Sequence, residues 1–410
     1  MRTTTMNKRN WVSLLGMLLL AITLRAQPLS PSAQVSVITV APGEALYSSF
    51  GHIILRVFDP VTGLDRPYNY GTFDFRTDNF YVKFLRGTLP YTLSVGDLYR
   101  EMAYWQYENR SAREQVLNLS PAQKQRLFDA LETNYRPENR EYQYKFYYDN
   151  CATRPVEMLV KACGDSLRFN NAVDTTRSFR QWMNDYLGRQ PWAQLGMNLA
   201  LGYPSDETAN AWQVMYLPNN VFAQLAKATI RMPNGQVMPL VQREQVLFQA
   251  AQTLPQELPF FMDPNVVFAI LGLLLALVTV RQYKAGKVSR RIDRVLFSFI
   301  GLCGWILLLL WVATNHGVTA WNPTILYLMP FHLPLIFWVT KPQNLRFANA
   351  YFGTTAILIV LGLLLAKVPG GAHILLGLTL LIRCFVNMRL SRNRSLMRTS
   401  GQSDDLIQTT

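Results

Sequence analysis

The chain has 410 residues, half of them hydrophobic, and this length predicts two or three domains. Its formal net charge of +14 does not indicate nucleic-acid binding, because residues 27–280 contain 22 Lys or Arg against 23 Asp or Glu and are nearly neutral. The excess lies at the N-terminus and in short loops between apolar segments, where it signals membrane topology.

Residues 1–26 have the pattern of a secretory signal peptide. Arg2, Lys8 and Arg9 precede an apolar run over residues 11–24, and Ala26 places a small residue where cleavage would occur. An uncleaved anchor is the alternative, and in both cases the following residues are exported. No cysteine follows the cleavage region, so we do not expect the chain to be a lipoprotein itself.

Residues 27–165 carry the signals of a small α+β domain, an antiparallel sheet with helices packed on it. Strands are predicted where apolar and polar residues alternate, and helices where apolar residues recur every three or four positions. Ser120, Pro121 and Gln123 form a capping-box start for one helix. In chain order we expect strands at 34–40, 52–57, 67–73, 80–85 and 91–94, a helix at 98–110, a strand at 113–119, a helix at 120–134 and an aromatic strand at 142–148.

The helix after the aromatic strand begins beside a cysteine. Asp149 and Asn150 are good N-caps, so Cys151 is expected at or near the first helical residue. A thiol there faces the positive end of the helix dipole and unpaired backbone N–H groups, which favour the thiolate and can also bind an oxyanion. For an isolated cysteine, a buried structural role is the alternative.

Cysteine spacing predicts that Cys151 is a free thiol. Its exported neighbour is Cys163, and on one continuous helix the twelve intervening steps separate the two by roughly 18 Å. A disulfide requires Cα atoms within about 7 Å. Cys151 is therefore available as a nucleophile, provided that the helix is continuous.

The candidate base follows from the scarcity of histidine. His52, at the start of the second strand, is the only histidine in the exported region, residues 27–258. A cysteine and a histidine within hydrogen-bond reach form a nucleophile and a general base. Asn69, on the next strand, is the candidate to orient the imidazole, with Tyr68 and Tyr70 as alternatives.

The remaining sequence divides into an extension and a membrane domain. Residues 166–258 are predicted to be mostly helical, and apolar residues at helical spacing over 241–254 predict a helix resting partly on the membrane surface. Residues 259–410 form the membrane domain. Five apolar segments are long enough to cross a bilayer, namely 264–280, 295–313, 324–340, 347–366 and 372–386.

Basic residues alternate between the loops of this membrane domain. Loops 281–294, 341–346 and 389–398 hold six, two and four Lys or Arg, whereas 314–323 and 367–371 hold one between them. Basic loops remain in the cytoplasm. The chain is therefore expected to be a multi-pass protein of a bacterial inner membrane, with its exported domain in the periplasm and its C-terminus inside.

The order of histidine and cysteine resembles that of a known group of enzymes. A histidine that opens an early strand, followed about a hundred residues later by an Asn-Cys pair at a helix start, is similar to circularly permuted NlpC-type proteins, including lecithin retinol acyltransferase. Here these positions are His52 and Asn150-Cys151. The resemblance implies a papain-like fold for residues 27–165.

A closer resemblance covers most of the chain. The motifs SFGH at 49–52, YNYGTFDF at 68–75, FLRG at 84–87, YDNCATR at 148–154 and MYLP at 215–218 resemble those of the Lnb-type periplasmic domain family, whose members add C-terminal membrane helices. The family is named after a bacterial lipoprotein N-acylating enzyme. The resemblance implies a thiol-dependent acyltransferase that needs no cofactor or metal. Its partners would be membrane phospholipids and the lipidated N-termini of lipoproteins.

The implied mechanism assigns roles to further residues. Cys151 would accept an acyl chain from a glycerolipid, either a phospholipid or the lipoprotein's own diacylglyceryl group, and pass it to the lipoprotein's α-amine. We expect Asn150 and Tyr70 to support the oxyanion site. Lipid headgroups or esters would meet a set of polar side chains, each of which also has an ordinary structural explanation: Arg56, Arg86, Arg154, Asn315, His316 and Asn322.

His332 is a separate candidate for a functional residue, because it is a polar residue inside a predicted span. Two other functions also remain open from the sequence. One is a cell-wall peptidase or amidase that uses the same cysteine and histidine with water as acceptor. The other is a membrane-anchored assembly protein without catalysis.

Overall fold

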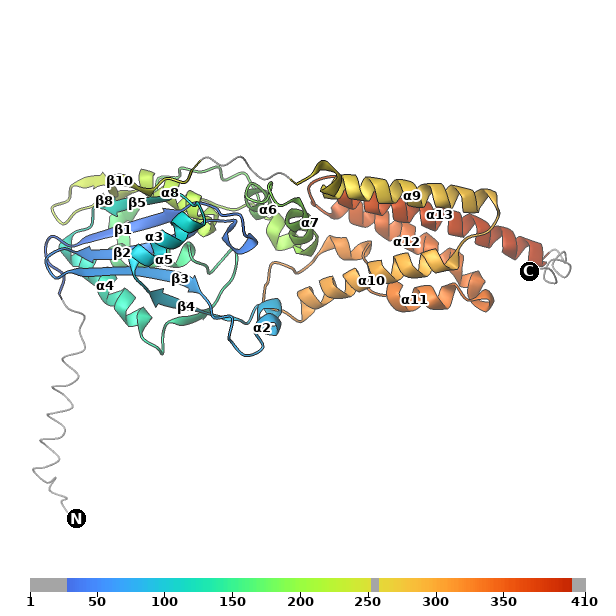
Figure 1. The fold of residues 1–410 in the computed structure, drawn as a ribbon, viewed down its shortest axis with the longest axis horizontal. Helices are drawn as coiled ribbons and strands as arrows, with labels where there is room; N and C mark the ends of the chain where they lie inside the picture. Colours follow the sequence, from blue (N-terminus) through green and yellow to red (C-terminus); the bar gives the residue numbers. More distant parts are fainter. Residues whose placement is uncertain (1–27, 252–257, 400–410) are drawn as a thin grey trace, which may run out of the picture.

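A computed structural model of the chain describes residues 28–251 and 258–399, so the predicted signal peptide lies outside the described residues. A sheet domain occupies one end of the molecule and a bundle of long helices the other (Figure 1). The short helices α6 (Phe179–Asn184) and α7 (Pro191–Ala200) lie between them.

A seven-stranded antiparallel sheet in the order β10-β5-β1-β2-β3-β4-β6 forms the N-terminal domain. A smaller sheet has the order β7-β8-β9. The strands are β1 (Gln34–Val40), β2 (His52–Asp59), β3 (Leu64–Thr72), β4 (Pro90–Val95), β5 (Ala112–Leu117), β6 (Glu141–Gln143), β7 (Leu167–Arg168), β8 (Thr229–Arg231), β9 (Val237–Pro239) and β10 (Val241–Phe248).

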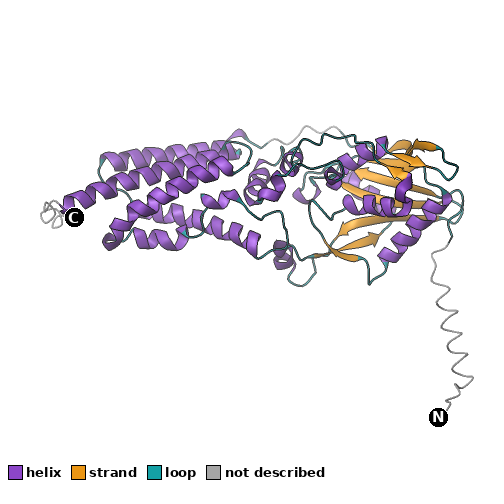
Figure 2. Ribbon diagram, turned by 180° about the vertical axis from the view of Figure 1, so that it is seen from behind, coloured by secondary structure: helices purple, strands orange, loops and turns teal. Residues whose placement is uncertain are grey.

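Helices cover both faces of the large sheet (Figure 2). Because side chains alternate along a strand, Val37 and Leu55 pack in one core with α4 (Pro121–Tyr135), α5 (Thr153–Cys163) and α8 (Pro218–Lys227). Ile38 and Ile54 face the other way and pack with Trp105 of α3 (Leu98–Tyr107). The α+β prediction is confirmed, whereas the papain-like permuted topology stays a prediction.

Most predicted elements of this domain are present. The strand at 34–40 has the predicted bounds, and β2 begins at His52. The predicted capping box is formed: Ser120 Oγ accepts from the Gln123 N–H, and the Gln123 side chain accepts from the Ser120 N–H. Local cap chemistry and alternation therefore predict these elements well.

The strand predicted at 80–85 is wrong, because this segment is the helix α2 (Phe80–Arg86). β3 pairs directly with β4, so the segment connecting them has no sheet edge to join. Phe80 and Phe84 stack one helical turn apart, and Gly87 ends the helix at φ 64°.

The aromatic strand predicted at 142–148 is largely wrong. Only β6 pairs with the sheet, and the chain then turns so that Lys145 and Asp149 bond each other's backbone. Asn150 stabilises this turn by donating to the Phe146 carbonyl, 2.8 Å away. The alternation of aromatic residues continues past the point where the partner strand ends.

The membrane-surface helix predicted at 241–254 is also wrong over its described part. Residues 241–248 form β10, which pairs with the edge of β5. An available sheet edge supplies backbone hydrogen bonds that override helical spacing. Residues 252–254 lie outside the described residues.

Among the described residues, four helices are long and apolar enough to cross a membrane, namely α9 (Pro264–Lys284), α10 (Arg290–Val312), α12 (Leu345–Leu365) and α13 (Ala372–Thr399). Asp263 caps α9 by accepting from the Asn265 N–H. Inside the bundle, the buried Arg383 of α13 donates to Asp293 of α10 and to Thr279 of α9.

The span predicted at 324–340 is not one helix. It breaks into a 3₁₀ turn (Pro323–Leu326) and the short helix α11 (His332–Val339). Pro330 lies in the break, where a missing N–H and the restricted residue before proline interrupt a helix. The other 3₁₀ turns are Leu46–Ser48, Gly164–Ser166, Tyr203–Asp206, Gln213–Tyr216, Phe260–Met262 and Pro342–Asn344.

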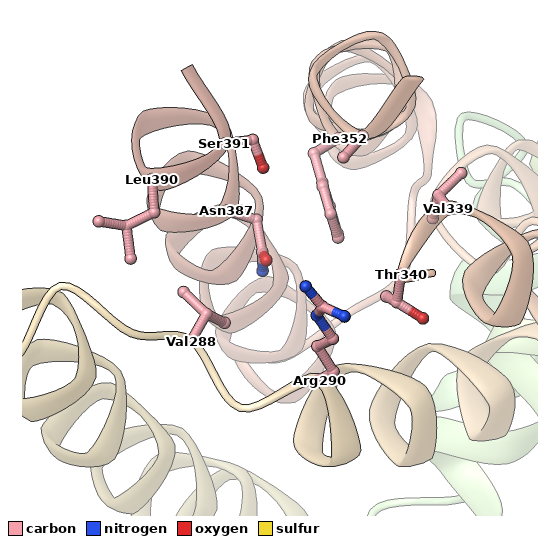
Figure 3. Close-up of a pocket in the computed structure, with 9 residues that line it drawn as sticks. Val288, Arg290, Val339, Thr340, Phe352, Asn387, Leu390 and Ser391 are labelled. Atoms are coloured by element: carbon pink, nitrogen blue, oxygen red, sulfur yellow. The ribbon is translucent and has the colours of Figure 1, made fainter. Parts of the chain in front are cut away.

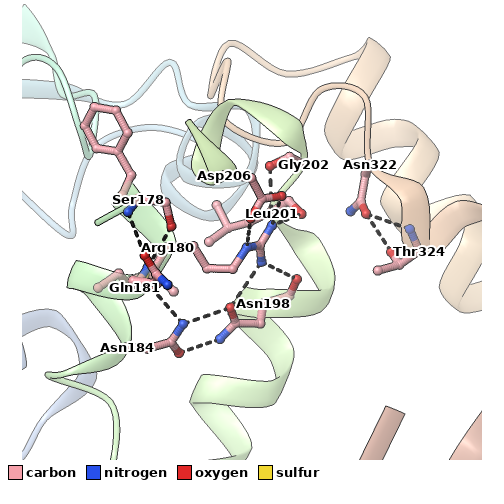
Figure 4. A network of polar contacts seen from close by, with 12 residues as sticks. Ser178, Arg180, Gln181, Asn184, Asn198, Leu201, Gly202, Asp206, Asn322 and Thr324 are labelled. Carbon is pink, nitrogen blue, oxygen red and sulfur yellow. Dashed lines mark hydrogen bonds and ion pairs between the residues drawn. The ribbon is translucent and has the colours of Figure 1, made fainter. Parts of the chain in front are cut away.

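Two sets of polar contacts lie where the extension meets the bundle, one around Arg180 and one between Asn322 and Thr324 (Figure 4). The buried guanidinium of Arg180 on α6 pairs with Asp206 and donates to the Asn198 carbonyl of α7. From the bundle side, Asn322 and Thr324 both donate to the Leu199 carbonyl, at 2.7 and 3.0 Å. The contacts of Asn322 and Thr324 hold the extension against the ends of the long helices.

Candidate active site

Cys151 lies in the turn between β6 and α5, two residues before the helix begins. Asn150 holds this turn with both ends of its side chain. Its Oδ1 accepts from the N–H groups of Ala152 and Thr153, and its Nδ2 donates to the carbonyl of Tyr216. The Cys151 N–H makes no hydrogen bond within the described residues and is available as an oxyanion donor.

The ends of β2 and β3 bring His52 beside the sulfur. Gly71 lies beside both residues: its φ is 96°, and a Cβ at this position would lie 3.4 Å from Cys151 Cβ and 3.8 Å from His52 Cε1. Both are ordinary van der Waals distances, so a side chain there would be disfavoured by the backbone conformation alone. The predicted nucleophile and base, distant in sequence, are thus adjacent.

Electrostatics favour a charged pair. Burial alone would lower the pKa of His52, but the Cys151 thiolate and the hydrogen bonds to Cys151 and Asn69 raise it. Burial alone would raise the pKa of Cys151, yet the His52 imidazolium and a hydrogen bond from Tyr144 lower it. Both shifts stabilise the same state, a thiolate beside an imidazolium.

Asn69 is the one of the three candidates that hydrogen-bonds the imidazole. Its Oδ1 lies 2.7 Å from His52 Nε2, so this nitrogen donates to Asn69 and the hydrogen bond to sulfur is left to Nδ1. The rivals Tyr68 and Tyr70 point to the opposite face of β3, where their hydroxyls donate to Glu132 and Asn134 of α4. Tyr70 therefore does not reach the oxyanion position that we predicted for it.

Glu101 continues this chain of contacts and was missed from the sequence. The Asn69 Nδ2 donates to Glu101 Oε1 at 3.0 Å, and the carboxylate also contributes to the raised pKa of His52. Glu101 lies one turn into α3, a helix that was predicted, but no local pattern indicates that this turn faces β3.

Tyr144 is a second residue whose role the sequence did not indicate. Its hydroxyl lies 3.7 Å from Cys151 Sγ, and burial together with the thiolate raises its pKa well above the ordinary value. It therefore stays protonated and can donate. We predicted Tyr144 only as one of several alternating strand residues.

The predicted headgroup arginines are placed differently from one another. Arg56 lies four residues along β2 from His52, about 13 Å away, and pairs with Asp65 and Glu114. Arg154 pairs with Asp149 and covers the Tyr142 ring at 3.6 Å. Both are structural ion pairs rather than open phosphate sites. Arg86 is exposed at the end of α2 and makes no ion pair within the described residues.

The polar residues predicted near the membrane have structural partners. Asn322 is buried, and its side chain bonds the Leu199 carbonyl and the Thr324 N–H, so it is not open to a headgroup. His316 Nε2 contacts the Leu85 carbonyl at 3.0 Å, and the Asn315 N–H donates to the Arg86 carbonyl. His332 is fully buried in the bundle against Tyr351 and does not belong to the Cys151 site.

Other parts of the described structure lack a comparable group of reactive side chains. A hollow at the far end of the bundle from Cys151 is lined by Arg290, Thr340, Asn387 and Ser391, among others (Figure 3). Across residues 28–251 and 258–399, no group of His, Cys, Asp and Glu side chains is arranged to hold a metal ion. All four cysteines are free. The arrangement around Cys151 is therefore the candidate active site.

Comparison with known proteins agrees with the division into a sheet domain and a helical bundle. A sequence model of the Lnb N-terminal periplasmic domain matches residues 25–183, and one of the Lnb transmembrane domain matches residues 256–395. No curated protein and no solved structure matches the chain. The two matches follow each other in the order of the two structural units, and the chain belongs to the Lnb-type family of membrane proteins with a periplasmic domain.

Proposed function

We propose that the protein is a cysteine acyltransferase of a bacterial inner membrane, which moves a fatty acyl chain from a glycerolipid to the N-terminal amine of lipoproteins. The observation that carries the proposal is the contact of Cys151 and His52, with Asn69 behind the imidazole, in a domain fixed against membrane-length helices. Family membership supports a lipoprotein as the acceptor.

In the first half-reaction, the Cys151 thiolate attacks the ester carbonyl carbon of the lipid. The tetrahedral oxyanion is stabilised by the Cys151 N–H and by the hydroxyl of Tyr144, which already lies near the sulfur. The carbon–oxygen bond then breaks, and the His52 imidazolium gives its proton to the departing alkoxide. The products are a thioester on Cys151 and an alcohol.

In the second half-reaction, the neutral α-amine of the lipoprotein attacks the thioester carbonyl carbon. His52, now neutral, accepts the proton that the amine loses, and the carbon–sulfur bond breaks. The products are an amide, the thiolate and the imidazolium, which is the starting pair. A thioester suits an amine acceptor because the thiolate is a better leaving group than an alkoxide.

The membrane bundle favours this function over cell-wall hydrolysis. A peptidase would use the same cysteine and histidine, but it has no need of four long apolar helices in contact with its domain. The periplasmic orientation is supported by loop charges. The poorly basic loops lie on the side of the sheet domain, where Asn315 bonds Arg86, and the basic loops lie at the other end.

The test restores a deletion strain with the native gene, Cys151→Ala or Cys163→Ala. Cys163 is the matched control, since it is a free and equally buried thiol one helix away. We expect mass spectrometry to find N-acylated lipoprotein N-termini with the native gene and Cys163→Ala, and free amines with Cys151→Ala. Unchanged N-acylation with Cys151→Ala contradicts the proposal. Altered cell-wall peptides with unchanged lipoproteins would indicate an amidase instead.

A further inference from the structure

Helix α2 presents an apolar surface that the rest of the protein leaves uncovered. None of its seven residues is buried, and Tyr81, Val82, Phe84 and Leu85 are more than half exposed, with Tyr81 at 76%. Water-exposed apolar side chains in such a cluster indicate a surface that meets another apolar phase.

The contacts of α2 place it at the level of the membrane surface. The helix ends against the loop that follows α10, where the Asn315 N–H donates to the Arg86 carbonyl at 2.8 Å. His316 bonds the Leu85 carbonyl and packs so closely on Gly87 that a Cβ there would lie 3.0 Å from its Nδ1. Since α10 ends at Val312, α2 lies within a few residues of the point where a membrane-length helix ends (Figure 1).

A second exposed apolar cluster marks the same level. Phe260, Phe261 and Met262 directly precede α9 and are exposed. The Trp192 indole donates to the Met262 carbonyl at 2.7 Å, so this turn is held beside α7. Aromatic residues next to the ends of membrane helices are typical of the bilayer interface.

A row of aromatic rings runs from α2 to the catalytic sulfur. Ring centroids are separated by 6.2 Å from Phe84 to Phe80 and by 5.9 Å from Phe80 to Phe73. The row continues from Phe73 to Tyr91 at 5.3 Å and from Tyr91 to Tyr144 at 4.6 Å, and the Tyr144 hydroxyl is 3.7 Å from Cys151 Sγ.

The row lies at the edge of the core, against which Tyr91 and Tyr144 pack, and protein covers it only in part. Phe73, Phe80, Tyr91 and Tyr144 each remain partly exposed, whereas the core residue Tyr142 beside them is buried. Aromatic faces of this kind bind an extended hydrocarbon chain without demanding a fixed chain length.

We propose that α2 inserts into the outer leaflet of the bilayer and that the aromatic row guides one acyl ester of a membrane glycerolipid to Cys151. The acyl donor would then be a lipid taken from the bilayer itself, and not a water-soluble acyl ester. This inference rests on the proposed acyltransferase function and adds the route and source of its first substrate.

Two basic residues on α2 complete the interface. Lys83 and Arg86 lie in the last turn of the helix, and neither forms an ion pair within the described residues. Cations at this depth extend to lipid phosphates while their stems stay among apolar groups. The helix therefore has the composition of an interfacial segment, with aromatic and aliphatic residues beside basic ones.

The first test uses the full-length protein in phosphatidylethanolamine vesicles and measures the acyl thioester on Cys151 by intact mass. Two donors are compared: the vesicle lipid, and the soluble ester p-nitrophenyl acetate, which needs no membrane route. The variant is Phe84→Ser with Leu85→Ser. The control is Tyr107→Ser, which alters a residue of α3 that is 88% exposed.

We expect the α2 variant to lose at least tenfold in acylation by vesicle lipid, while acylation by the soluble ester stays within twofold of the native rate. The control should match the native protein with both donors. Equal losses with both donors, or no loss with either, would overturn the inference. A native protein that neither donor acylates would instead contradict the proposed function.

The second test identifies what covers α2. Benzoylphenylalanine replaces Phe84 in one variant and Tyr107 in another, and the full-length protein is irradiated in the same vesicles. A phospholipid adduct at position 84 and none at position 107 is the expected result. A crosslinked dimer through position 84 would show that a second copy covers this face, and the bilayer assignment would be wrong.

Discussion

The contribution of Glu101 to the reactivity of Cys151 can be divided into an effect of its charge and an effect on the orientation of His52. This is possible because Glu101 reaches the imidazole only through the side chain of Asn69. Its carboxylate accepts from Asn69 Nδ2 at 3.0 Å, and Asn69 Oδ1 accepts from His52 Nε2 at 2.7 Å. Glu101→Gln keeps an acceptor oxygen and removes the negative charge. Glu101→Ala removes both. The two variants therefore divide the effect into a charge part and an orientation part.

The expected magnitudes follow from these contacts. A hydrogen bond to a charged group contributes about 1.5–3 kcal/mol, and the lower end applies because Glu101 is only partly buried. If this free energy holds Asn69 in place, Glu101→Ala should slow acylation of Cys151 about tenfold, since about 1.4 kcal/mol corresponds to that factor. Glu101→Gln should slow it much less.

The charge part appears in the pH dependence. The Glu101 carboxylate helps to raise the pKa of His52, so its removal lowers that pKa. The imidazolium is lost as the pH rises through the His52 pKa, and the alkaline limb of the acylation rate should therefore shift to lower pH in both variants. The acidic limb reports Cys151 and should move less, because Glu101 contacts Asn69 and not the sulfur.

The assay is acylation of the full-length protein by p-nitrophenyl acetate in detergent between pH 5 and 10, with the melting temperature as a check on folding. Glu101→Gln with an unshifted alkaline limb would refute the electrostatic argument. Glu101→Ala with a native rate would refute the orientation argument. A lowered melting temperature with a native pH profile would leave Glu101 with a structural role only.

Four further outcomes are expected. Peptide mapping after treatment with iodoacetamide at pH 7 should find Cys151 alkylated and Cys163 unmodified. The two thiols are similarly exposed, at 8% and 6%, but burial raises the pKa of Cys163 to about 11, whereas the pKa of Cys151 is lowered. Equal alkylation of the two would contradict the charged pair of Cys151 and His52. Asn69→Ala should leave the melting temperature unchanged and reduce the acylation rate about 10²-fold, because nothing would then hold the imidazole in its reactive position. Tyr144→Phe should cost about 10²-fold if its hydroxyl holds the oxyanion, and less than tenfold would remove it from that role. Gly71→Ala should destabilise the fold by about 1–3 kcal/mol in urea unfolding, given its φ of 96°, and a native midpoint would contradict backbone strain at this position.

The sequence singled out His52 and Cys151, which the structure places side by side, and offered Asn69 as the first of three candidates to orient the imidazole. His52 was singled out because the exported region has no other imidazole, and Cys151 because Asn150 predicts a helix start. The choice of Asn69 over Tyr68 and Tyr70 needed the structure. Adjacent positions on a strand face opposite sides, and which side of β3 faces His52 depends on how β2 and β3 pair.

Glu101 and Tyr144 could not be found from the sequence for a related reason. Glu101 reaches Asn69 only because α3 packs on the face of the sheet opposite α4 and α5, and a single helix pattern does not contain that choice. Tyr144 reaches the sulfur only because β6 stops at Gln143 and the chain then turns. The Glu101 contact joins two elements that were both predicted, whereas the Tyr144 contact depends on a turn that the predicted strand at 142–148 did not contain.

Two segments whose structure differs from the expected one lie where the sheet domain meets the helical bundle. Segment 80–86 is the helix α2, which contacts the loop after α10, and segment 324–340 begins with a turn whose Thr324 bonds the extension at Leu199. Periodicity predicts how a segment buries one face against its own domain. At a junction, one segment faces protein on one side and the apolar phase on another, so its pattern fits neither a half-buried strand nor a uniform membrane span. The ambiguity of these segments is therefore itself a signal. It marks the level at which, in our proposal, a lipid leaves the bilayer for Cys151.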